Sequence, residues 1–253
     1  MLTDTHCHLF KEYYKDLDKV LKDASNNGVN RYIVDADNIA SCHELLETTK
    51  KYGNLYITLG IHPENCDEDP QVIDDLIKDN IDSGKIVAVG EIGLDYYYTK
   101  DNKDKQQDLF RAQLDIAKKY NLPVIVHSRE ATKDTIDILK EYPDVHGVIH
   151  CFSGSLETAL EYIKMGYYIG VGGVLTFKNS KLDDIIKELP VVRILFETDA
   201  PFLAPEPHRG HTNEPKYIKD IAEYASKLFD LSLDEISAIT ESNVNTLFFK
   251  KKD

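Results

Sequence analysis

Cysteine is scarce in this sequence, and nothing in its placement pairs one cysteine with another. The 253 residues include four cysteines, which show neither a CxxC pair nor a disulfide-rich spacing: Cys7, Cys42, Cys66 and Cys151. A disulfide framework is therefore not expected, and reduced thiols in a cytoplasmic protein are the simpler interpretation.

Long apolar runs are also missing. No segment approaches the roughly 18 apolar residues that a membrane-spanning helix needs. The first residues lack the basic region followed by an apolar region that marks a secretion signal. We therefore expect no association with a membrane and a cytoplasmic location.

Positive charge is in deficit. The 30 Lys and Arg residues are outnumbered by 44 Asp and Glu residues, which gives a formal net charge of −14 and a pI near 5.1. Such a protein is not drawn over long distances to nucleic acid or to an anionic membrane. A phosphate-bearing substrate would have to be captured by local contacts.

Short apolar segments alternate with amphipathic segments along the chain. The continuous apolarity of residues 124–126 is typical of a parallel strand that is covered on both faces, whereas residues 18–24 and 109–120 carry apolar positions at helical spacing. The alternation is typical of a (β/α)8 barrel or of an open doubly wound sheet. Eight strands are predicted, at residues 2–6, 31–35, 55–60, 86–91, 124–127, 148–150, 168–171 and 194–197.

No linker, internal repeat or low-complexity segment divides the chain, so we expect one domain over residues 1–253. Barrels of the α/β type commonly take about 250 residues. The proline-rich stretch 200–215 is predicted to fold over the rim of an active site. Two closing helices are predicted at 217–229 and 233–249, with Asp230 or Ser232 as the cap of the second.

Two histidines, His6 and His8, lie at the end of the first predicted strand. Side chains two residues apart on a strand share a face, so both imidazoles can reach one cation, while Cys7 points the other way. This pattern favours a metal site.

Four more residues of metal-ligand type each follow an apolar run. They are Glu91, His127, His150 and Asp199. A barrel brings the C-terminal ends of strands one, four, five, six and eight round one rim, whereas an open sheet would separate the first strand from some of the others. The positions of these residues therefore favour a (β/α)8 TIM barrel with the metal site at the C-terminal end of the strands.

Other interpretations of single residues exist, because an HxH pair can be a coincidence and a lone histidine such as His150 is commonly a hydrogen-bonded core residue. A buried cluster of four histidines and two carboxylates, however, is unfavourable unless a cation compensates for their desolvation. Imidazole and carboxylate ligands without cysteine are typical of an open catalytic site for cations such as Mg, Mn or Zn. Two cations about 3.5 to 4 Å apart need a shared ligand, and Glu91 is predicted to be that bridge.

The sequence resembles the TatD family of metal-dependent deoxyribonucleases, within the amidohydrolase-like metallohydrolases, nearly from end to end. The resemblance is carried by residues 3–9 (TDTHCHL), 60–63 (GIHP), 90–96 (GEIGLDY), 122–129 (LPVIVHSR), 149–154 (IHCFSG) and 196–201 (FETDAP). It implies a TIM barrel and two divalent cations. One cation would be held by His6, His8, Glu91 and Asp199, and the other by Glu91, His127 and His150.

Asp199 and Glu91 are the candidate catalytic residues. A divalent cation lowers the pKa of a bound water from about 15.7 towards neutrality, and Asp199 could orient this water and take its proton. The alternative is that Asp199 is a structural ligand only, because ligation and base catalysis cannot be separated from sequence.

Three residues near the predicted site are candidates for binding a substrate phosphate. They are His62, Arg129 and Arg209. Arginine suits bidentate contact with phosphate oxygens, although an ion pair with a nearby carboxylate is the alternative for Arg129. The sequence departs from the family at His211 and Thr212, where basic residues are more usual, and at Phe10, where a small polar residue is common. The tyrosines at 96–98 could stack on a nucleobase or simply cover the end of the barrel.

Three functions are weighed. A nuclease that acts on DNA, most plausibly on single-stranded ends, is favoured by the resemblance and by a barrel mouth that admits a flexible strand more readily than a duplex. A metallohydrolase with a small ester, lactone or amide substrate is the first alternative, since the fold does not fix the substrate. A metal-stabilised binding module is the second, but a set of open ligands argues against it. No obligatory protein partner is indicated.

Overall fold

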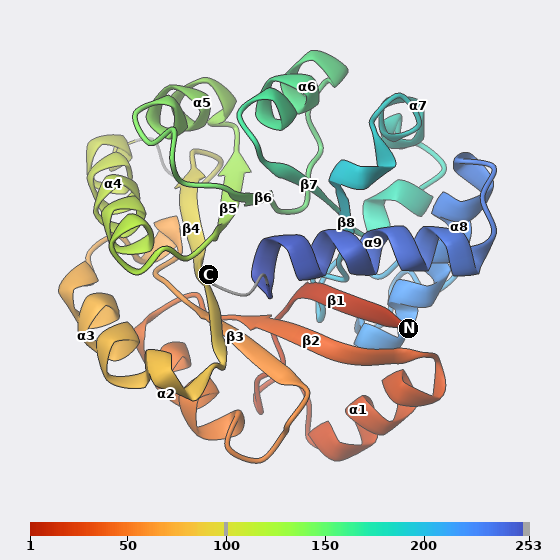
Figure 1. The fold of residues 1–253 in the computed structure, drawn as a ribbon, viewed down its shortest axis with the longest axis horizontal. Coiled ribbons are helices and arrows are strands. Elements are labelled where there is room, and N and C mark those ends of the chain that lie inside the picture. The colour runs from red at the N-terminus through yellow and green to blue at the C-terminus, as the bar shows by residue number, and fades with distance from the viewer. Residues whose placement is uncertain (99–100, 250–253) are drawn as a thin grey trace.

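A ring of eight parallel strands forms the centre of the protein within the described residues, 1–98 and 101–249, of the computed structural model. Each strand pairs with its neighbour in the sequence, from β1 through to β8 (Figure 1). The strands are β1 (Leu2–Cys7), β2 (Val29–Asp35), β3 (Leu55–Leu59), β4 (Ile86–Asp95), β5 (Val124–Arg129), β6 (Gly147–Ile149), β7 (Tyr168–Val171) and β8 (Ile194–Phe196). The predicted barrel is confirmed.

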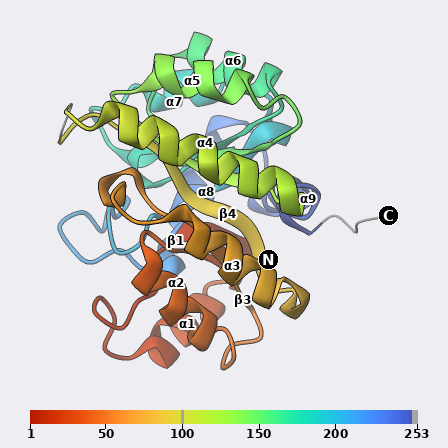
Figure 2. The same ribbon diagram turned by 90° about the vertical axis from the view of Figure 1, so that its left-hand side faces the viewer.

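Helices surround the ring. They are α1 (Leu17–Asn26), α2 (Ile39–Thr48), α3 (Pro70–Asn80), α4 (Lys103–Tyr120), α5 (Thr132–Lys140), α6 (Leu156–Lys164), α7 (Leu182–Ile186), α8 (Ile218–Leu228) and α9 (Leu233–Phe248). In Figure 2, α3 and α4 lie side by side on the outside of the barrel, and α4 packs over β4. Short 3-10 helices occur at Pro63–Asn65, Ile81–Ser83, Gly173–Thr176, Val191–Arg193 and Pro215–Tyr217.

The ring closes between its first and last strands. A parallel bridge joins Cys7 to Ala200, just beyond β8. The N–H of Asp199 donates to the His6 carbonyl at 3.0 Å, and the N–H of His8 donates to the Ala200 carbonyl at 2.7 Å. This closure places Asp199 beside the two histidines of β1.

The opposite, N-terminal end of the barrel is sealed by α9, which crosses it in Figure 1. Val244 and Phe248 of α9 pack against residues at the start of several strands, such as Val87, Ile125 and Val148. The helix begins at a capping box in which Ser232 accepts from the Glu235 N–H and Glu235 accepts from the Ser232 N–H, which confirms one of the two predicted caps. With this end filled, the C-terminal end is the one open to a ligand.

The stretch that follows β8 is irregular, as expected, up to the 3-10 helix Pro215–Tyr217. Its Asn213 amide donates to the carbonyls of Thr198 and Phe202 at 2.7 and 2.6 Å, and the Tyr14 hydroxyl donates to the Asn213 carbonyl at 2.6 Å. These bonds fasten the stretch to the C-terminal end of the barrel. Across the described residues, none of the helices combines the length and apolarity required to cross a bilayer.

Candidate metal centre

The histidines of the first strand face each other at the barrel mouth. The Nε2 atoms of His6 and His8 lie 3.1 Å apart. The other nitrogen of His8 lies 3.1 Å from the Asp35 carbonyl oxygen, and that of His6 lies 3.3 Å from the Asp35 carboxylate. If each ring carries its proton on Nδ1, the proton of His8 faces the Asp35 carbonyl, that of His6 faces the Asp35 carboxylate, and the two Nε2 lone pairs point at each other. That arrangement is repulsive unless a cation lies beside both.

Glu91 divides its two carboxylate oxygens between two pairs of histidines. Oε2 lies 3.5 Å from His6 Nε2 and 3.8 Å from His8 Nε2. Oε1 lies 2.8 Å from His127 Nδ1 and 3.2 Å from His150 Nε2. Each oxygen therefore belongs to a different donor set, which is the geometry that a ligand shared between two cations requires.

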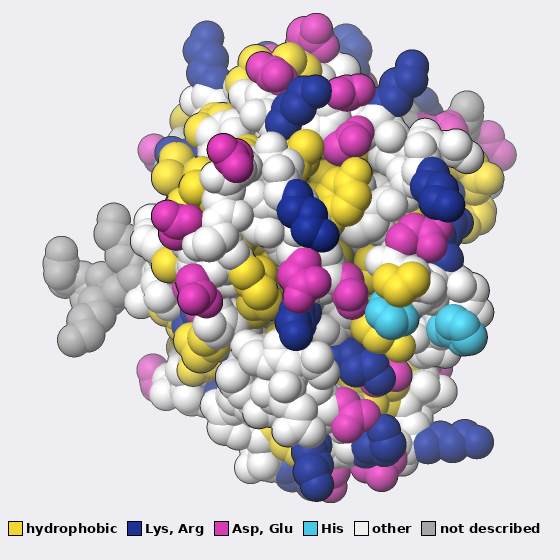
Figure 3. All heavy atoms as spheres, turned by 90° about the vertical axis from the view of Figure 1, so that its right-hand side faces the viewer, with side chains coloured by type: hydrophobic (Ala, Val, Ile, Leu, Met, Phe, Trp, Pro, Cys, Tyr) yellow, Lys and Arg dark blue, Asp and Glu magenta, His cyan; other side chains and the backbone are white. Residues whose placement is uncertain are grey.

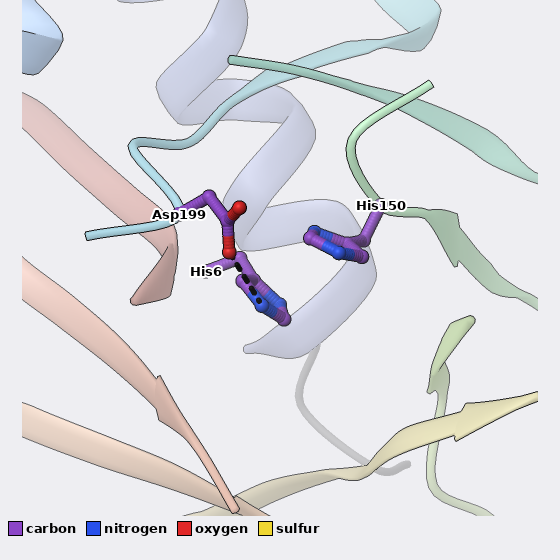
Figure 4. Close-up of side chains that lie close together, drawn as sticks. All are labelled: His6, His150 and Asp199. Carbon is purple, nitrogen blue, oxygen red and sulfur yellow. Dashed lines mark ion pairs between the residues drawn. The ribbon is translucent and has the colours of Figure 1, made fainter. Parts of the chain in front are cut away.

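Asp199 completes the first donor set from the other side of the ring closure. Its Oδ1 lies 3.7 Å from the Nε2 atoms of both His6 and His8. Figure 4 shows its carboxylate turned towards His6, with the ring of His150 to the right of both residues. The imidazoles of His6 and His150 stack at 3.8 Å between ring centroids. Asp199 adopts a left-handed backbone conformation with a φ of 58°, which aspartate tolerates better than most residues.

Potential ligand atoms gather in overlapping groups, within each of which they lie no more than 4.8 Å apart. Three such groups together contain all six predicted ligands: His6 with His150 and Asp199, His6 with His8 and Glu91, and Glu91 with His127 and His150. The predicted residues are thus brought together, and their donor chemistry fits one or more divalent cations. A further group joins His62, Asp95 and His127.

A second layer of carboxylates orients the imidazoles, and the sequence interpretation did not find it. His150 Nδ1 lies 3.3 Å from Glu197 Oε1, and His127 Nε2 lies 3.1 Å from Asp95 Oδ2. Asp35 contacts both histidines of β1: its carboxylate lies beside His6, and its backbone carbonyl lies beside His8. Contacts of this kind fix the tautomer and orientation of ligating histidines. Glu197 is completely buried, and the absence of a side chain at Gly170 makes room for it, because a Cβ there would collide with its carboxylate.

Asp4 anchors the segment that carries Asp199. Its carboxylate accepts hydrogen bonds from the N–H and the hydroxyl of Thr198 at 2.9 and 2.6 Å, and Thr198 directly precedes Asp199. The segment TDTHCHL contains Asp4, the segment FETDAP contains Glu197, and Asp35 and Glu197 each end a predicted strand. No periodicity in the sequence separates such polar strand residues from the ligands.

Burial sets the protonation of the site. It lowers the pKa of His6 to about 3 and that of His62 to about 4, so both imidazoles are neutral at physiological pH and keep a free lone pair. Burial opposes the charge of Glu91, but the neighbouring His150 and a hydrogen bond from His127 outweigh it and hold the pKa of Glu91 well below its usual range. Burial raises the pKa of Asp199. A cation would stabilise both carboxylates.

The predicted substrate residues lie at different distances from this centre. His62 and Arg129 line a cavity of about 690 Å³ at the barrel mouth, together with five of the six predicted ligands. His62 Nε2 lies 3.8 Å from Glu91 Oε1, and the Arg129 guanidinium lies over the Tyr97 ring at 3.8 Å. Arg209 is not among the residues that line the cavity and lies instead over the ring of Phe177 at 3.9 Å.

A family model described as TatD related DNase matches residues 3–249 of the chain. The chain belongs to this family. The Bacillus subtilis protein named uncharacterized metal-dependent hydrolase YabD is 42% identical, over 98% of this chain and 99% of its own length. An Escherichia coli K12 relative with the same description, YcfH, is 38% identical over 98% of this chain and 95% of its own length.

Solved structures of the TatD family have the same fold. The crystal structure of YjjV, a TatD homolog from Escherichia coli, has a TM-score of 0.90 and 35% sequence identity, and the match covers 99% of this chain and 98% of that one. A hydrolase of the TatD family from Entamoeba histolytica has a TM-score of 0.89 at 27% identity, with 99% and 98% covered. The resemblance seen in the sequence motifs is therefore confirmed for the family and for the fold.

Proposed function

We propose that this TatD-family protein is a metal-dependent hydrolase that cleaves phosphodiester bonds in DNA, acting on single-stranded ends. The observation that carries the proposal is the division of the Glu91 carboxylate between two histidine pairs. Pairs of metal ions that share a ligand are typical of enzymes that hydrolyse phosphate esters. The family description, TatD related DNase, supports DNA as the substrate.

Two cations would be held by the six residues at the mouth. His6, His8 and Asp199 would hold the first, His127 and His150 the second, and Glu91 both. Bound divalent cations supply Lewis acidity, which makes water a stronger acid and polarises a phosphoryl oxygen. The carboxylates of Asp35, Glu197 and Asp95 keep the imidazoles aimed at these positions.

Asp199 is the proposed acceptor of the proton of the attacking water. It lines the cavity, and its Oδ1 faces the histidines of β1 at 3.7 Å, so its other oxygen remains for a hydrogen bond to water. A carboxylate in this position would orient the water and accept its proton. Such a role adds to ligation and does not replace it.

Arg129 is the proposed contact for the substrate phosphate. It lies two residues beyond His127, lines the same cavity, and has its guanidinium held over the rings of Tyr97 and Tyr98. Stacking restrains the plane of the guanidinium and leaves its edge N–H groups for phosphate oxygens. The net charge of −14 makes a local contact of this kind necessary.

The test is an assay of the purified protein after removal of metal and reloading with Mg, Mn or Zn. Single-stranded and duplex DNA labelled at the 5′ or the 3′ end would be compared with simple phosphodiesters and lactones. We expect metal-dependent shortening of single strands, and ladders from one labelled end will give the polarity. His150→Ala should abolish this activity. His43→Ala, at an exposed histidine on α2, is the matched control. Turnover of lactones with intact DNA would refute the proposed substrate.

A further inference from the structure

Large exposed apolar side chains gather at the barrel mouth. Over its whole surface, the described part of the chain exposes these large apolar side chains: Met1, Tyr13, Tyr97, Tyr98, Leu160, Val192, Phe202 and Leu203. Four of them line the cavity above the candidate metal centre: Tyr13, Tyr98, Phe202 and Leu203. Exposed apolar groups that are grouped at one place, rather than scattered singly, mark binding surfaces.

The first group, the Phe202 cluster, consists of Phe202 and Tyr13. Their rings meet edge to face with centroids 5.8 Å apart. The Phe202 ring also lies 6.0 Å from the ring of the candidate ligand His8, and buried Phe10 lies under Tyr13 at 6.3 Å. A flat group seated on Phe202 would therefore lie next to the metal centre. Phe202 is 48% exposed, so part of its side chain is accessible to such a group.

The second group, the Tyr98 cluster, consists of Tyr97, Tyr98 and Arg129. The Arg129 guanidinium lies 3.8 Å from the centroid of Tyr97 and 5.1 Å from that of Tyr98, and the two rings are edge to face at 4.8 Å. Tyr98 is 67% exposed. The cluster combines a flat cation for a phosphate with an aromatic surface for a base.

The strand order sets the two clusters on opposite sides of the metal centre. The Phe202 cluster comes from the segments that follow β1 and β8, which are neighbours at the ring closure. The Tyr98 cluster comes from the segment after β4 and from the end of β5, which are also neighbours. In a ring of eight strands, the β8–β1 junction lies across from the β4–β5 junction. Because Tyr13 and Phe202 of the first cluster and Tyr98 and Arg129 of the second line one cavity, a ligand that spans it touches both clusters and passes over the metal centre.

The charge of the protein indicates what kind of contact must provide the affinity. With a formal charge of −14, general attraction to a phosphate backbone is unfavourable. On the face drawn in Figure 3, basic and acidic side chains are interspersed and form no continuous basic patch. Stacking on aromatic rings does not depend on net charge, and it accepts any base because every base has a π-face.

We propose that the Phe202 and Tyr98 clusters each stack an unpaired nucleobase, one on either side of the phosphodiester that lies over the metal centre. The proposal rests on the proposed function and makes it more specific: the substrate is recognised through its unpaired bases. Bases in a duplex are already stacked and cannot be seated on both clusters, so the proposal also predicts a preference for single strands.

The experiment compares two fluorescently labelled strands of about eight nucleotides, both with hydrolysis-resistant phosphorothioate linkages. One is oligothymidylate, and the other carries abasic residues on the same backbone. Their Kd values for the metal-loaded protein are measured by fluorescence anisotropy. Variants are Phe202→Ala and Tyr98→Ala, with Tyr98→Phe as the conservative variant and Leu160→Ala, at an exposed site on α6, as the control. Cleavage of ordinary DNA by the wild type is measured in parallel.

We expect Phe202→Ala and Tyr98→Ala to raise the Kd for oligothymidylate by about 5- to 150-fold each, the range that stacking on one aromatic ring provides, and to leave the Kd for the abasic strand unchanged. Tyr98→Phe and Leu160→Ala should bind like the wild type. Equal losses for both strands, or no loss, would overturn the proposal. Wild-type protein that cleaves DNA but binds both strands equally would refute stacking alone, whereas base-dependent binding without cleavage would refute the nuclease function alone.

Discussion

Replacing Glu197 by glutamine isolates the electrostatic part of metal binding. In the wild type, Oε1 of this buried carboxylate accepts the Cys151 N–H and lies 3.3 Å from His150 Nδ1. Among the described residues, Oε2 has no hydrogen-bond partner. Glutamine can keep its oxygen at the Oε1 position and place its amide nitrogen at the Oε2 position. The shape is then preserved, while the negative charge beside His150 is lost.

The expected loss follows from this geometry. Without the charge, the His150 imidazole becomes a weaker base and a weaker ligand, and two amide protons are buried without an acceptor. Carboxylates that orient ligating histidines contribute about 10- to 100-fold to metal affinity or activity, which corresponds to about 1.4 to 2.7 kcal/mol. Leaving a buried donor without a partner costs about 1 to 3 kcal/mol, so the metal-free protein should also lose some stability.

The assay is competition for Zn²⁺ against a fluorescent chelator, with the metal content of the dialysed protein measured alongside. We expect Glu197→Gln to weaken the occupancy of the His127–His150 donor set by about 10- to 100-fold and to leave the other set largely filled. Glu188→Gln, at an exposed glutamate, is the matched control and should behave like the wild type. An unchanged Kd for both cations in Glu197→Gln would refute the role assigned to this carboxylate.

Three further predictions concern the centre itself. Asp199→Asn should lower kcat by at least about 100-fold, the usual contribution of a general base, while elemental analysis still finds most of the metal; undiminished turnover would contradict its role in proton transfer. Glu91→Ala should lose both metal and activity, and a metal content equal to that of the wild type would show that Glu91 does not bridge. Saturation of the metal-free protein with its cation at about 100 times the Kd should add about 2.7 kcal/mol of stability and raise the Tm by about 5 to 10 °C; calorimetry that finds equal Tm values would contradict binding to the folded centre.

Much of the fold could be predicted because the apolar pattern of each segment agreed with the place of that segment in the barrel. Continuous apolar runs such as 124–126 gave the buried strands, and the helices between them were marked by their apolar stripes. Boundaries were less accurate: β4 extends to Asp95 and β5 to Arg129, beyond the predicted ends at 91 and 127. A polar ligand interrupts the apolar run in each strand, although backbone pairing between the two strands continues beyond it.

The candidate ligands could be named from the sequence because each of them directly follows an apolar run or, like His8, lies two residues from one that does. Their supporting residues could not, because Asp35, Glu197 and Asp95 are defined by what they contact across the ring. The same limit applies to the arginines. Arg129 and Arg209 were both candidates for binding the substrate phosphate, but of the two Arg129 lines the cavity, whereas Arg209 lies over Phe177.

The sequence by itself determined the alternation of strands and helices and the kind of atoms that lie at the strand ends, because both depend on residues close together in the chain. Only the tertiary structure decided how the two oxygens of Glu91 are shared, which carboxylate orients each imidazole, and that two aromatic clusters lie across the mouth from each other. These relations depend on closing the ring, which brings Asp199 to His6 across 193 positions of the chain and is specified by the packing of the whole barrel rather than by any one segment.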